Sequence, residues 1–358
     1  MLDSLLPISD DCRIQLPDER KRPVGIIGTG AIVDVAHLPA YRQLGLEVAA
    51  VTDLDLDRAR DVAQRHGVAK VHTSAEDLIA DDAVEIVDIA VTPWAQPDLA
   101  RAALKAGKHV LCQKPLALEP EEAASLAQEA DHHGRHLAVN QQLRFDEGFA
   151  AARSMLRRGW IGEPLQVTFH VDIATDFSAW DWFAKHERME ITYHSIHYLD
   201  AIRSLLGDPE RVFCTGSKAP GQYPVGETRT ISTLVYPGEV RALVHSHHEN
   251  RAGDNEATFR LTGSEGAIRG TLGLLYNYPH GRPDTVEVSS RTLPTDGWLA
   301  YPVTERWLPD AFRGPMASLL NAIAAGEKPE TSAHDNVSTV RLVDALYRSM
   351  ETGESQCL

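Results

Sequence analysis

Residues 23–40 read PVGIIGTGAIVDVAHLPA, and this stretch decides the fold. A short apolar run leads into Gly28 and Gly30, and a segment compatible with a helix follows. Glycines in such a strand, turn and helix unit let the backbone approach a pyrophosphate at the helix N-terminus. Val33 replaces the third glycine of the GxGxxG pattern, so the motif alone is a weak indicator. We expect a dinucleotide to lie against the residues of this turn, which are Gly28, Thr29, Gly30, Ala31 and Ile32.

An acidic residue ends the next predicted strand. The sequence LEVAAVTDLDLDRA places Asp53 about two dozen residues after the turn, where a carboxylate accepts hydrogen bonds from an adenosine ribose. No Arg or Lys lies between Asp53 and Asp57, so a 2′-phosphate would meet uncompensated negative charge. The pattern therefore favours NAD(H) over NADP(H). The alternative is that Asp53 only caps the helix that begins near Asp55, but turn and acid together favour cofactor binding.

Helix-like and strand-like segments then alternate as far as residue 142. The helix-like segments are 55–66, 75–80, 96–106 and 119–134, and the strand-like ones are VEIVDIAVTP, KHVLCQKP and HLAVNQ. This alternation predicts a parallel, doubly wound sheet that binds ligands at the carboxyl ends of its strands. Five side chains fall at or just beyond such ends: Thr92, Pro93, Gln113, Lys114 and Gln142.

Beyond Glu163 the pattern changes. Strand-like runs separated by Gly, Pro or Asp turns predict a largely antiparallel sheet. The runs are LQVTFHVDI, RVFCTGS, TRTISTLVY, EVRALVHSHH, ATFRLTG and GAIRGTL. Between the first two lies ITYHSIHYLDAIRSLLG, a predicted helix that ends at Gly207. Its buried stripe is expected to be Ile196, Leu199, Ile202 and Leu206.

The length of 358 residues is enough for about two domains. We expect a polar leader at 1–22 and a nucleotide-binding domain with a doubly wound parallel (Rossmann) sheet at 23–145. A C-terminal α+β domain at 146–358 is expected to contain a large, mainly antiparallel open sheet. Its last helices are free to pack back onto the first domain.

The composition is that of an ordinary globular protein, with 24% charged and 43% hydrophobic residues and a net charge of −16. An acidic surface repels phosphates and anionic lipids, so neither nucleic acid nor a membrane is an expected partner. The four cysteines form no CxxC pair, which favours a reducing compartment. The leader is acidic where a signal peptide would be basic, and we expect a cytoplasmic protein.

Several motifs resemble the glucose-fructose oxidoreductase, inositol dehydrogenase and MocA (Gfo/Idh/MocA) family of oxidoreductases. The resemblance runs from Val24 to about Gly353. The motifs are GTGAIVDVAHLPA, VTP, CQKPLAL, NQQLRF and the closing LLNAIAAGEKPETSAHDNVSTVRLVDALYRSM. They are specific for the family and the fold, and they say little about the substrate. The resemblance implies further cofactor contacts at Trp94 and Gln96.

In that family an EKP triplet supplies a lysine to the active site, and the matching residues are Gln113, Lys114 and Pro115. An ammonium there can donate to the oxygen of a reacting carbinol and stabilise a developing alkoxide. A nearby nicotinamide cation and partial burial would lower its pKa toward a useful value. A surface lysine in a turn is the alternative, and the strand-end position favours the catalytic role.

The family also carries DxGxH at the start of the helix before Gly207, and the matching positions are Tyr193, Ser195 and His197. The histidine is retained and the aspartate is not. We expect His197 to be the general base, because a neutral imidazole can take a hydroxyl proton near pH 7. Tyr193 would donate a hydrogen bond to the sugar or to His197. A phenol beside an ammonium could instead carry the proton, so the choice between the two stays open.

The pocket of a typical family member is not expected here unchanged. Glu190 stands where the family has small residues, and it shares a helical face with His194. Trp182 could stack on the apolar face of a pyranose, although such tryptophans are as often plain packing. The candidate substrate residues are Arg144, Trp182, Glu190 and His194.

The motif HSHHEN places His245 and His247 on one face of a strand. We expect no metal there, because no Asp, Glu or Cys cluster accompanies them in sequence and hydride transfer needs none. The resemblance implies that the open face of this sheet packs against another subunit. The expected assembly is therefore a homodimer or a homotetramer.

Together these features predict an NAD(H)-dependent dehydrogenase that oxidises a secondary hydroxyl of a sugar, glycoside or cyclic polyol. The same site also fits a keto-sugar or dihydrodiol-type reductase. A catalytically silent NAD-binding regulator is a third hypothesis, since the family aspartate is missing. The presence of both Lys114 and His197 argues against the regulator.

Overall fold

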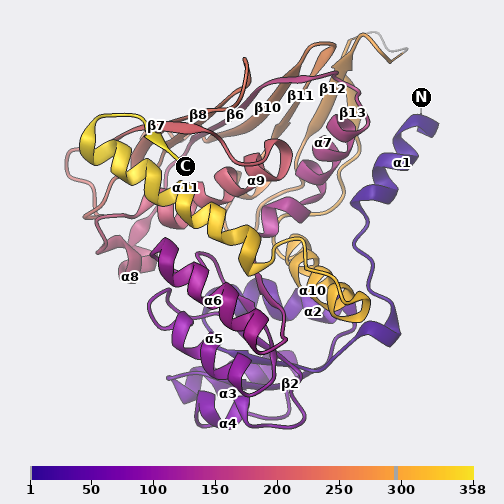
Figure 1. Cartoon of the computed structure of the whole chain (residues 1–358), viewed down its shortest axis with the longest axis vertical. Helices are drawn as coiled ribbons and strands as arrows, with labels where there is room; N and C mark the ends of the chain where they lie inside the picture. Colours follow the sequence, from indigo (N-terminus) through magenta and orange to yellow (C-terminus); the bar gives the residue numbers. More distant parts are fainter. Residues whose placement is uncertain (1, 294–296) are drawn as a thin grey trace. The chain divides into compact units, whose positions relative to one another are not determined.

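The computed structural model describes residues 2–293 and 297–358, and they form two compact units (Figure 1). The parallel-sheet unit contains Ile14–Gln142 and Leu308–Val340. The large-sheet unit contains Met1–Arg13, Leu143–Trp307 and Arg341–Leu358. Segments distant in sequence thus join in each unit. The domain boundaries 1–22, 23–145 and 146–358 stay sequence predictions. The apolar pattern of a helix near a chain end shows that one face is buried, but it does not show which of the two sheets that face packs against.

The parallel-sheet unit confirms the doubly wound sheet. Its strands run in the order β2-β1-β3-β4-β5, and every pairing between them is parallel. They are β1 (Val24–Ile27), β2 (Val48–Thr52), β3 (Ile86–Ile89), β4 (His109–Cys112) and β5 (Leu137–Val139). All residues of β1 and β3 are buried, as expected for strands covered on both faces.

Helices of this unit begin and end at the residue types that physical chemistry favours. They are α2 (Leu38–Leu44), α3 (Leu56–His66), α4 (Ala75–Ile79), α5 (Gln96–Lys105), α6 (Pro120–His132) and α10 (Arg313–Ala325). The side chains of Asp55 and Ser74 accept hydrogen bonds from the backbone at the starts of α3 and α4. Gly45 and Gly67 end α2 and α3 in the left-handed conformation. These caps fix where each helix meets the sheet.

The large-sheet unit contains a nine-stranded sheet in the order β13-β12-β11-β10-β6-β9-β8-β7-β14. Its strands are β6 (Pro164–Asp172), β7 (Arg211–Ser217), β8 (Arg229–Val235), β9 (Arg241–His247), β10 (Glu256–Gly263), β11 (Gly266–Thr271), β12 (Val286–Ser290), β13 (Leu299–Tyr301) and β14 (Gln356–Cys357). Strands β6 and β9 pair in parallel, and the other pairings are antiparallel. The mainly antiparallel sheet of the prediction is therefore confirmed.

One face of this sheet is covered by helices. Figure 1 shows α7 (Glu147–Arg157), α9 (Ile196–Leu206) and the C-terminal part of α11 (Ala333–Thr352) along it. Alternate residues of β9 are buried, and an aromatic core of Phe149, Phe169, Phe259 and Tyr198 lies between sheet and helices. The predicted stripe of α9 is buried at Ile196, Leu199 and Ile202, while Leu206 is partly exposed.

The elements that were not predicted include β12, β13 and the first helix. Strands β12 and β13 are short and lie at one edge of the large sheet, where the alternation pattern is weak. Residues Leu2–Cys12 form helix α1 within the predicted polar leader. Leu5 and Ile8 are buried, and α1 contacts α7, so two apolar side chains one turn apart outweigh the polar composition.

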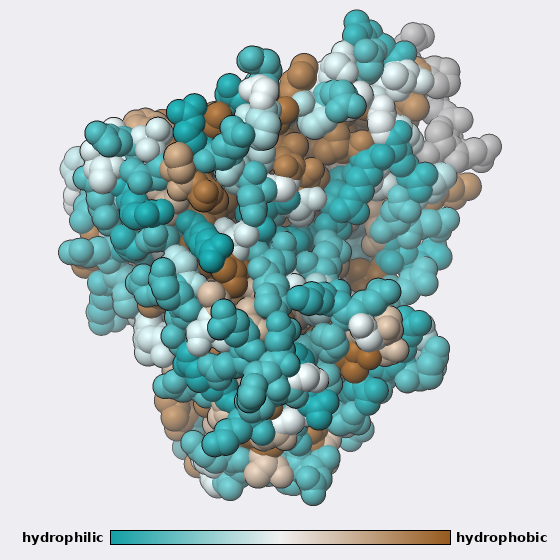
Figure 2. All heavy atoms as spheres, viewed as in Figure 1, coloured by the Kyte–Doolittle hydropathy of each residue, from teal (hydrophilic) through white to brown (hydrophobic). Residues whose placement is uncertain are grey.

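The described helices include none that is both long and apolar enough to span a bilayer. Figure 2 shows hydrophilic side chains over most of the visible face, with hydrophobic ones in smaller groups.

Candidate active site

The glycine turn follows β1 as predicted. Gly28 has φ +93°, and a Cβ atom there would lie 2.3 Å from the carbonyl oxygen of Ala90, so no other residue fits. A Cβ on Gly30 would meet no atom within 4 Å, which leaves the backbone of the turn open to a ligand. The chain then winds as a π-helix over Val33–His37 before α2 begins. Val33 occupies the position of the third glycine of the GxGxxG pattern. Its side chain is fully buried and is part of the hydrophobic core.

Asp53 ties the end of β2 to the glycine turn. Its Oδ2 atom accepts hydrogen bonds from the backbone nitrogen and the hydroxyl of Thr29, at 2.6 and 3.0 Å. Burial by itself raises the pKa of the Asp53 carboxyl, but these bonds and the neighbouring Arg58 hold it below its ordinary value. The helix cap is Asp55, whose Oδ1 accepts from the nitrogen of Arg58. The alternative that Asp53 merely caps α3 is therefore wrong.

The sequence argument for uncompensated charge at Asp53 missed Arg58. The guanidinium Nη2 of Arg58 lies 2.6 Å from Asp53 Oδ1, and Nη1 lies 3.4 Å from Asp55 Oδ2. The arginine stands five positions after the acid, on the first turn of α3, and therefore faces back toward the strand end. The carboxylates of Asp53 and Asp55 and the guanidinium of Arg58 together still leave a net negative charge at the end of β2.

Lys114 lies in a turn after β4 that three carbonyl contacts hold in place. The Nε2 atom of Gln96 donates to the carbonyl oxygens of Gln113, Pro115 and Leu116, at 2.8, 2.9 and 3.2 Å. The predicted cofactor residue Gln96 therefore supports this turn. Lys114 is partly exposed, and desolvation by the surrounding protein lowers the pKa of its ammonium to about 7. The lysine thus changes protonation state near neutral pH.

Sequence reasoning missed a buried polar network behind this turn. His37 Nδ1 lies 2.6 Å from Asp88 Oδ2, and the hydroxyl of Tyr41 donates to the same oxygen at 2.7 Å. The Nε2 atom of Gln113 lies 2.6 Å from His37 Nε2. Because the amide nitrogen can only donate, His37 Nε2 accepts and Nδ1 carries the proton toward Asp88. The available signal was Asp88 itself, the one acid among the residues IVDI of β3.

The remaining predicted cofactor residues lie at carboxyl ends of the parallel strands. The carbonyl of Thr92, after β3, accepts from the nitrogens of Ala95 and Gln96 and so begins α5. Pro93 is buried and Trp94 is half-exposed in the same loop. Gln142 follows β5 in a short 3-10 helix and is buried. The structure therefore gathers these positions at the edge of the sheet that carries the glycine turn and Lys114.

The predicted helix of the large-sheet unit begins as a π-helix over Ile191–Ser195 and continues as α9. A π turn closes one residue later than an α turn, so it shifts the direction of side chains before α9 relative to those on it. The ring of Tyr193 packs against Trp182 and Phe183, at centroid distances of 5.3 Å. The ring of His197 meets Trp307 edge-on at 5.5 Å. Tyr193 and His197 thus lie against different aromatic partners.

Burial distinguishes the two candidate proton acceptors. Tyr193 is buried, and desolvation raises the pKa of its phenol to about 12. A phenol with that pKa stays protonated near neutral pH and acts there as a hydrogen-bond donor. His197 is partly exposed, although its Nδ1 atom is buried. Of the two side chains, His197 is therefore the more accessible.

Two of the candidate substrate residues are engaged inside the protein. Arg144 makes a bidentate pair with Asp200, with Nε 2.6 Å from Oδ2 and Nη2 2.7 Å from Oδ1. Both side chains are almost fully buried, so this pair holds the segment after β5 to α9. Glu190 has no exposed surface on its side chain. Direct substrate contact is therefore not supported for either residue.

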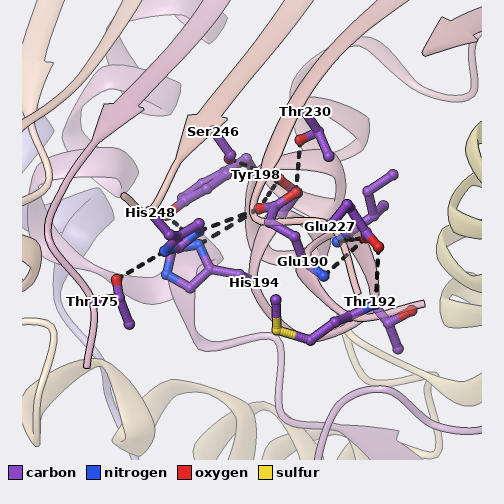
Figure 3. A network of polar contacts seen from close by, with 12 residues as sticks. Thr175, Glu190, Thr192, His194, Tyr198, Glu227, Thr230, Ser246 and His248 are labelled. Carbon is purple, nitrogen blue, oxygen red and sulfur yellow. Dashed lines mark hydrogen bonds and ion pairs between the residues drawn. The ribbon is translucent and has the colours of Figure 1, made fainter. Parts of the chain in front are cut away.

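Glu190 lies at the centre of a polar network (Figure 3). Its Oε1 accepts from the hydroxyl of Ser195 and its Oε2 from that of Thr230, both at 2.7 Å. Two imidazoles lie close to Oε1: His248 Nε2 at 3.6 Å and His194 Nδ1 at 3.9 Å. The side chain of His194 is 28% exposed, so this network reaches the surface of the unit.

A second buried acid orders the start of this helix. Glu227 Oε1 accepts from the backbone nitrogen of Glu190 at 2.9 Å and from the hydroxyl of Tyr347 at 2.6 Å. The backbone nitrogens of Met189 and Ile191 lie 3.4 Å from the same carboxylate. A carboxylate against the unsatisfied nitrogens of a helix start stabilises that start.

The histidines of HSHHEN divide between the two faces of the sheet. His245 Nδ1 lies 2.9 Å from His170 Nδ1, and His247 Nδ1 lies 2.8 Å from Asp172 Oδ1. These four side chains are half-buried residues of β6 and β9 on the open face. His248, one residue later, is buried and belongs to the network around Glu190.

Comparisons with known proteins identify the family of both sheet-containing parts of the chain. Residues 22–141 match a family model described as an oxidoreductase family with an NAD-binding Rossmann fold. Residues 149–269 match the GFO/IDH/MocA C-terminal domain.

Curated relatives and solved structures extend over most of the chain. A D-apiose dehydrogenase of Paraburkholderia graminis is 28% identical over 328 residues, 89% of this chain and 85% of the relative. A D-xylose 1-dehydrogenase (NADP⁺) of Haloferax volcanii is 28% identical over 335 residues, 92% of this chain and 97% of the relative. A solved oxidoreductase from Agrobacterium radiobacter, in complex with NAD⁺, L-tartaric acid and magnesium, covers 94% of this chain and 98% of its own. Its TM-score is 0.83 at 23% identity, a likeness that concerns the fold alone.

Proposed function

The chain belongs to the Gfo/Idh/MocA family of oxidoreductases, and on that premise we propose that it oxidises a secondary hydroxyl of a sugar, glycoside or cyclic polyol with NAD⁺. The observation that carries the proposal is Lys114, whose pKa of about 7 suits a group that exchanges hydrogen bonds and protons with a reacting alcohol. The relatives named for D-apiose and D-xylose support a sugar as the substrate.

The residues present fit a dinucleotide. The open space at Gly30 leaves the backbone of the turn free for phosphates. When bound, the nicotinamide accepts the hydride from the carbinol carbon. The chain contributes the orientation of the alcohol and the removal of its proton.

We assign Lys114 to the alcohol oxygen and His197 to the proton. The Lys114 ammonium donates a hydrogen bond to that oxygen and stabilises the negative charge that develops as the proton leaves. The neutral imidazole of His197 accepts the proton, and the hydride leaves with its electron pair, so the products are a ketone or lactone, NADH and one proton. Tyr193 acts as a hydrogen-bond donor because its phenol stays protonated.

A spectrophotometric assay tests this function. Purified protein is mixed with NAD⁺ and a panel of aldoses, glycosides and cyclic polyols, and the absorbance of NADH is followed. We expect turnover with at least one sugar or polyol and its loss in Lys114→Ala. Tight NAD(H) binding without turnover of any compound in either direction would contradict the proposal and favour a regulator.

We also propose that NAD(H) is preferred over NADP(H). The support is the net negative charge of Asp53, Asp55 and Arg58 together, which disfavours a 2′-phosphate. The Haloferax relative is named for NADP⁺, so the preference has to be measured for this chain.

The proposed assembly is a homodimer or homotetramer through the open face of the large sheet, in the cytoplasm. Apolar side chains such as Phe213 and Ile231 are 39% and 49% exposed on β7 and β8. They supply the kind of surface that a second subunit covers. Sedimentation equilibrium measures the assembly, and a monomer at micromolar concentration would contradict it. All four cysteines are free thiols, which fits a reducing compartment.

A further inference from the structure

Three metal-ligand side chains converge within the large-sheet unit (Figure 3). Glu190 precedes the π-helix, His194 lies within it, and His248 follows β9. One ligand atom from each lies within 4.8 Å of the others. In the described part of the chain, residues 2–293 and 297–358, this is the one group of three such residues with that spacing.

His248 provides a second, independent observation. Its side chain is fully buried, and its Nε2 atom has no hydrogen-bond partner among the described residues. The other ring nitrogen, Nδ1, lies 2.9 Å from the hydroxyl of Thr175, which fixes the ring so that Nε2 faces the Glu190 carboxylate at 3.6 Å. A buried nitrogen without a partner is costly unless something occupies its lone pair.

The surroundings of the other two ligands also suit a cation. The hydroxyls of Ser195 and Thr230 donate to Glu190. The His194 and His248 rings stand perpendicular at a centroid distance of 4.3 Å. The hydroxyls on Glu190, and the Thr175 hydroxyl beside His248 Nδ1, are contacts of the kind that orient metal ligands in known sites.

We propose that Glu190, His194 and His248 bind a divalent transition-metal ion, with Zn²⁺ as the preferred ion. Two imidazoles and one carboxylate are a common zinc ligand set, whereas Mg²⁺ and Ca²⁺ prefer oxygen alone. Tetrahedral ligands about 2.0–2.1 Å from zinc lie roughly 3.3 Å apart. The separations of 3.6 and 3.9 Å from Glu190 Oε1 thus need only small side-chain movements to close on an ion.

This site differs from the one weighed in the sequence. The pair His245 and His247 lies on the opposite face of the sheet, next to His170 and Asp172. The ion binds instead through the third histidine of HSHHEN. It ties the π-helical start of α9 to the segment after β9, and three protein ligands leave a fourth position for water or a substrate oxygen on the exposed side of His194.

The experiment measures zinc binding directly, without cofactor or substrate. Tag-free full-length protein is dialysed against a chelator and titrated with Zn²⁺ against a chromophoric competitor. We expect one Zn²⁺ per chain, no displacement by excess Mg²⁺, and visible absorption bands of a four-coordinate site when Co²⁺ is used. Glu190→Gln and His248→Ala should each raise the Kd for Zn²⁺ by more than about 100-fold, beyond the usual effect of losing an outer contact.

Two further variants make the result decisive. His194→Ala changes a partly exposed side chain, so it keeps the fold and loses the ion. His245→Ala is the matched control, because His245 lies on the opposite face of β9, the strand that His248 follows. This variant should keep the Zn²⁺ affinity of the wild type. Substoichiometric zinc binding, unchanged affinity in Glu190→Gln and His194→Ala, or loss of zinc in His245→Ala would each overturn the proposal. Because NAD⁺ is absent, none of these results depends on the proposed dehydrogenase activity.

Discussion

At the scale of single residues, Lys114 shows what a sequence motif gives and what it lacks. The QKP triplet predicts the position of the lysine, because a proline-stiffened turn at a strand end is a local feature. Its pKa of about 7 comes from desolvation by the folded protein around the turn. In the same way the buried position of Tyr193 could not be predicted, since Trp182 and Phe183 come from another element.

The lowered pKa of Lys114 makes a prediction about stability. In the folded protein this lysine loses its proton above about pH 7, whereas an unfolded lysine keeps it to about pH 10. Between these values the unfolded state binds more protons, so this group makes folding more favourable as pH rises. Lys114→Met should therefore be more stable than the wild type at pH 6, by about 1–4 kcal/mol allowing for partial exposure, and the gain should shrink toward pH 9.

Urea unfolding of both proteins at pH 6 and pH 9, followed by circular dichroism, measures this difference. A variant that is no more stable than the wild type at pH 6 would show that Lys114 is well solvated and unperturbed.

The proton acceptor can be identified by two substitutions. His197→Ala should lower kcat by about 10²- to 10⁴-fold, the usual contribution of a general base. Tyr193→Phe keeps the ring packing on Trp182 and removes one donor, so we expect less than about a 10-fold loss. Steady-state kinetics of NADH formation measure both. The assignment is wrong if the tyrosine variant is the one that loses turnover.

At the scale of elements, the connections between strands and helices determine which side chains meet, and spacing in the sequence does not predict these contacts. Asp53 at the end of β2 was predicted, but Arg58 was not, because its position on the first turn of α3 brings it back over the acid. The helix before Gly207 was predicted from its apolar stripe, but its π-helical start was not. That start depends on the buried carboxylate of Glu227, from a distant segment.

We expect the residues of the β2–α3 connection to determine the preference for NAD⁺ over NADP⁺. Asp53→Asn keeps the size of the side chain and removes its charge, so the ratio of kcat/KM for NAD⁺ to that for NADP⁺ should fall by about 10-fold, roughly 1.4 kcal/mol. Asp57→Asn is the control, because this exposed acid pairs with Arg60 and should leave the ratio unchanged. A wild-type preference for NADP⁺, or an equal shift in the control, would refute the role given to Asp53.

The start of the π-helix depends on Glu227. Glu227→Ala leaves backbone nitrogens and the Tyr347 hydroxyl without their acceptor, so we expect a loss of about 2–3 kcal/mol in the free energy of unfolding. The exposed Glu187 is the control, and Glu187→Ala should change stability by less than about 0.5 kcal/mol. Similar unfolding midpoints for the two variants would mean that Glu227 does not order the helix.

At the scale of the whole molecule, the two sheets were predictable and the grouping of terminal segments was not. Alternation of strand-like and helix-like segments predicts the parallel sheet, and strand-like runs separated by Gly, Pro or Asp turns predict the large one. The acids near the N-terminus favour a polar leader in the sequence, whereas the structure has helix α1 there with Leu5 and Ile8 buried. Strand β12 depends on pairing with β11, and the edge strand β13 depends on pairing with β12. Local pattern does not encode these pairings.

The central claim is that Lys114 serves hydride transfer from a sugar or polyol hydroxyl, and a crystal structure with NAD⁺ and a turned-over substrate tests it most directly. We predict that the nicotinamide C4 lies against a secondary carbinol carbon and that the oxygen on this carbon lies within hydrogen-bond distance of Lys114 Nζ. A bound substrate whose reacting oxygen contacts neither Lys114 nor His197 would contradict the account.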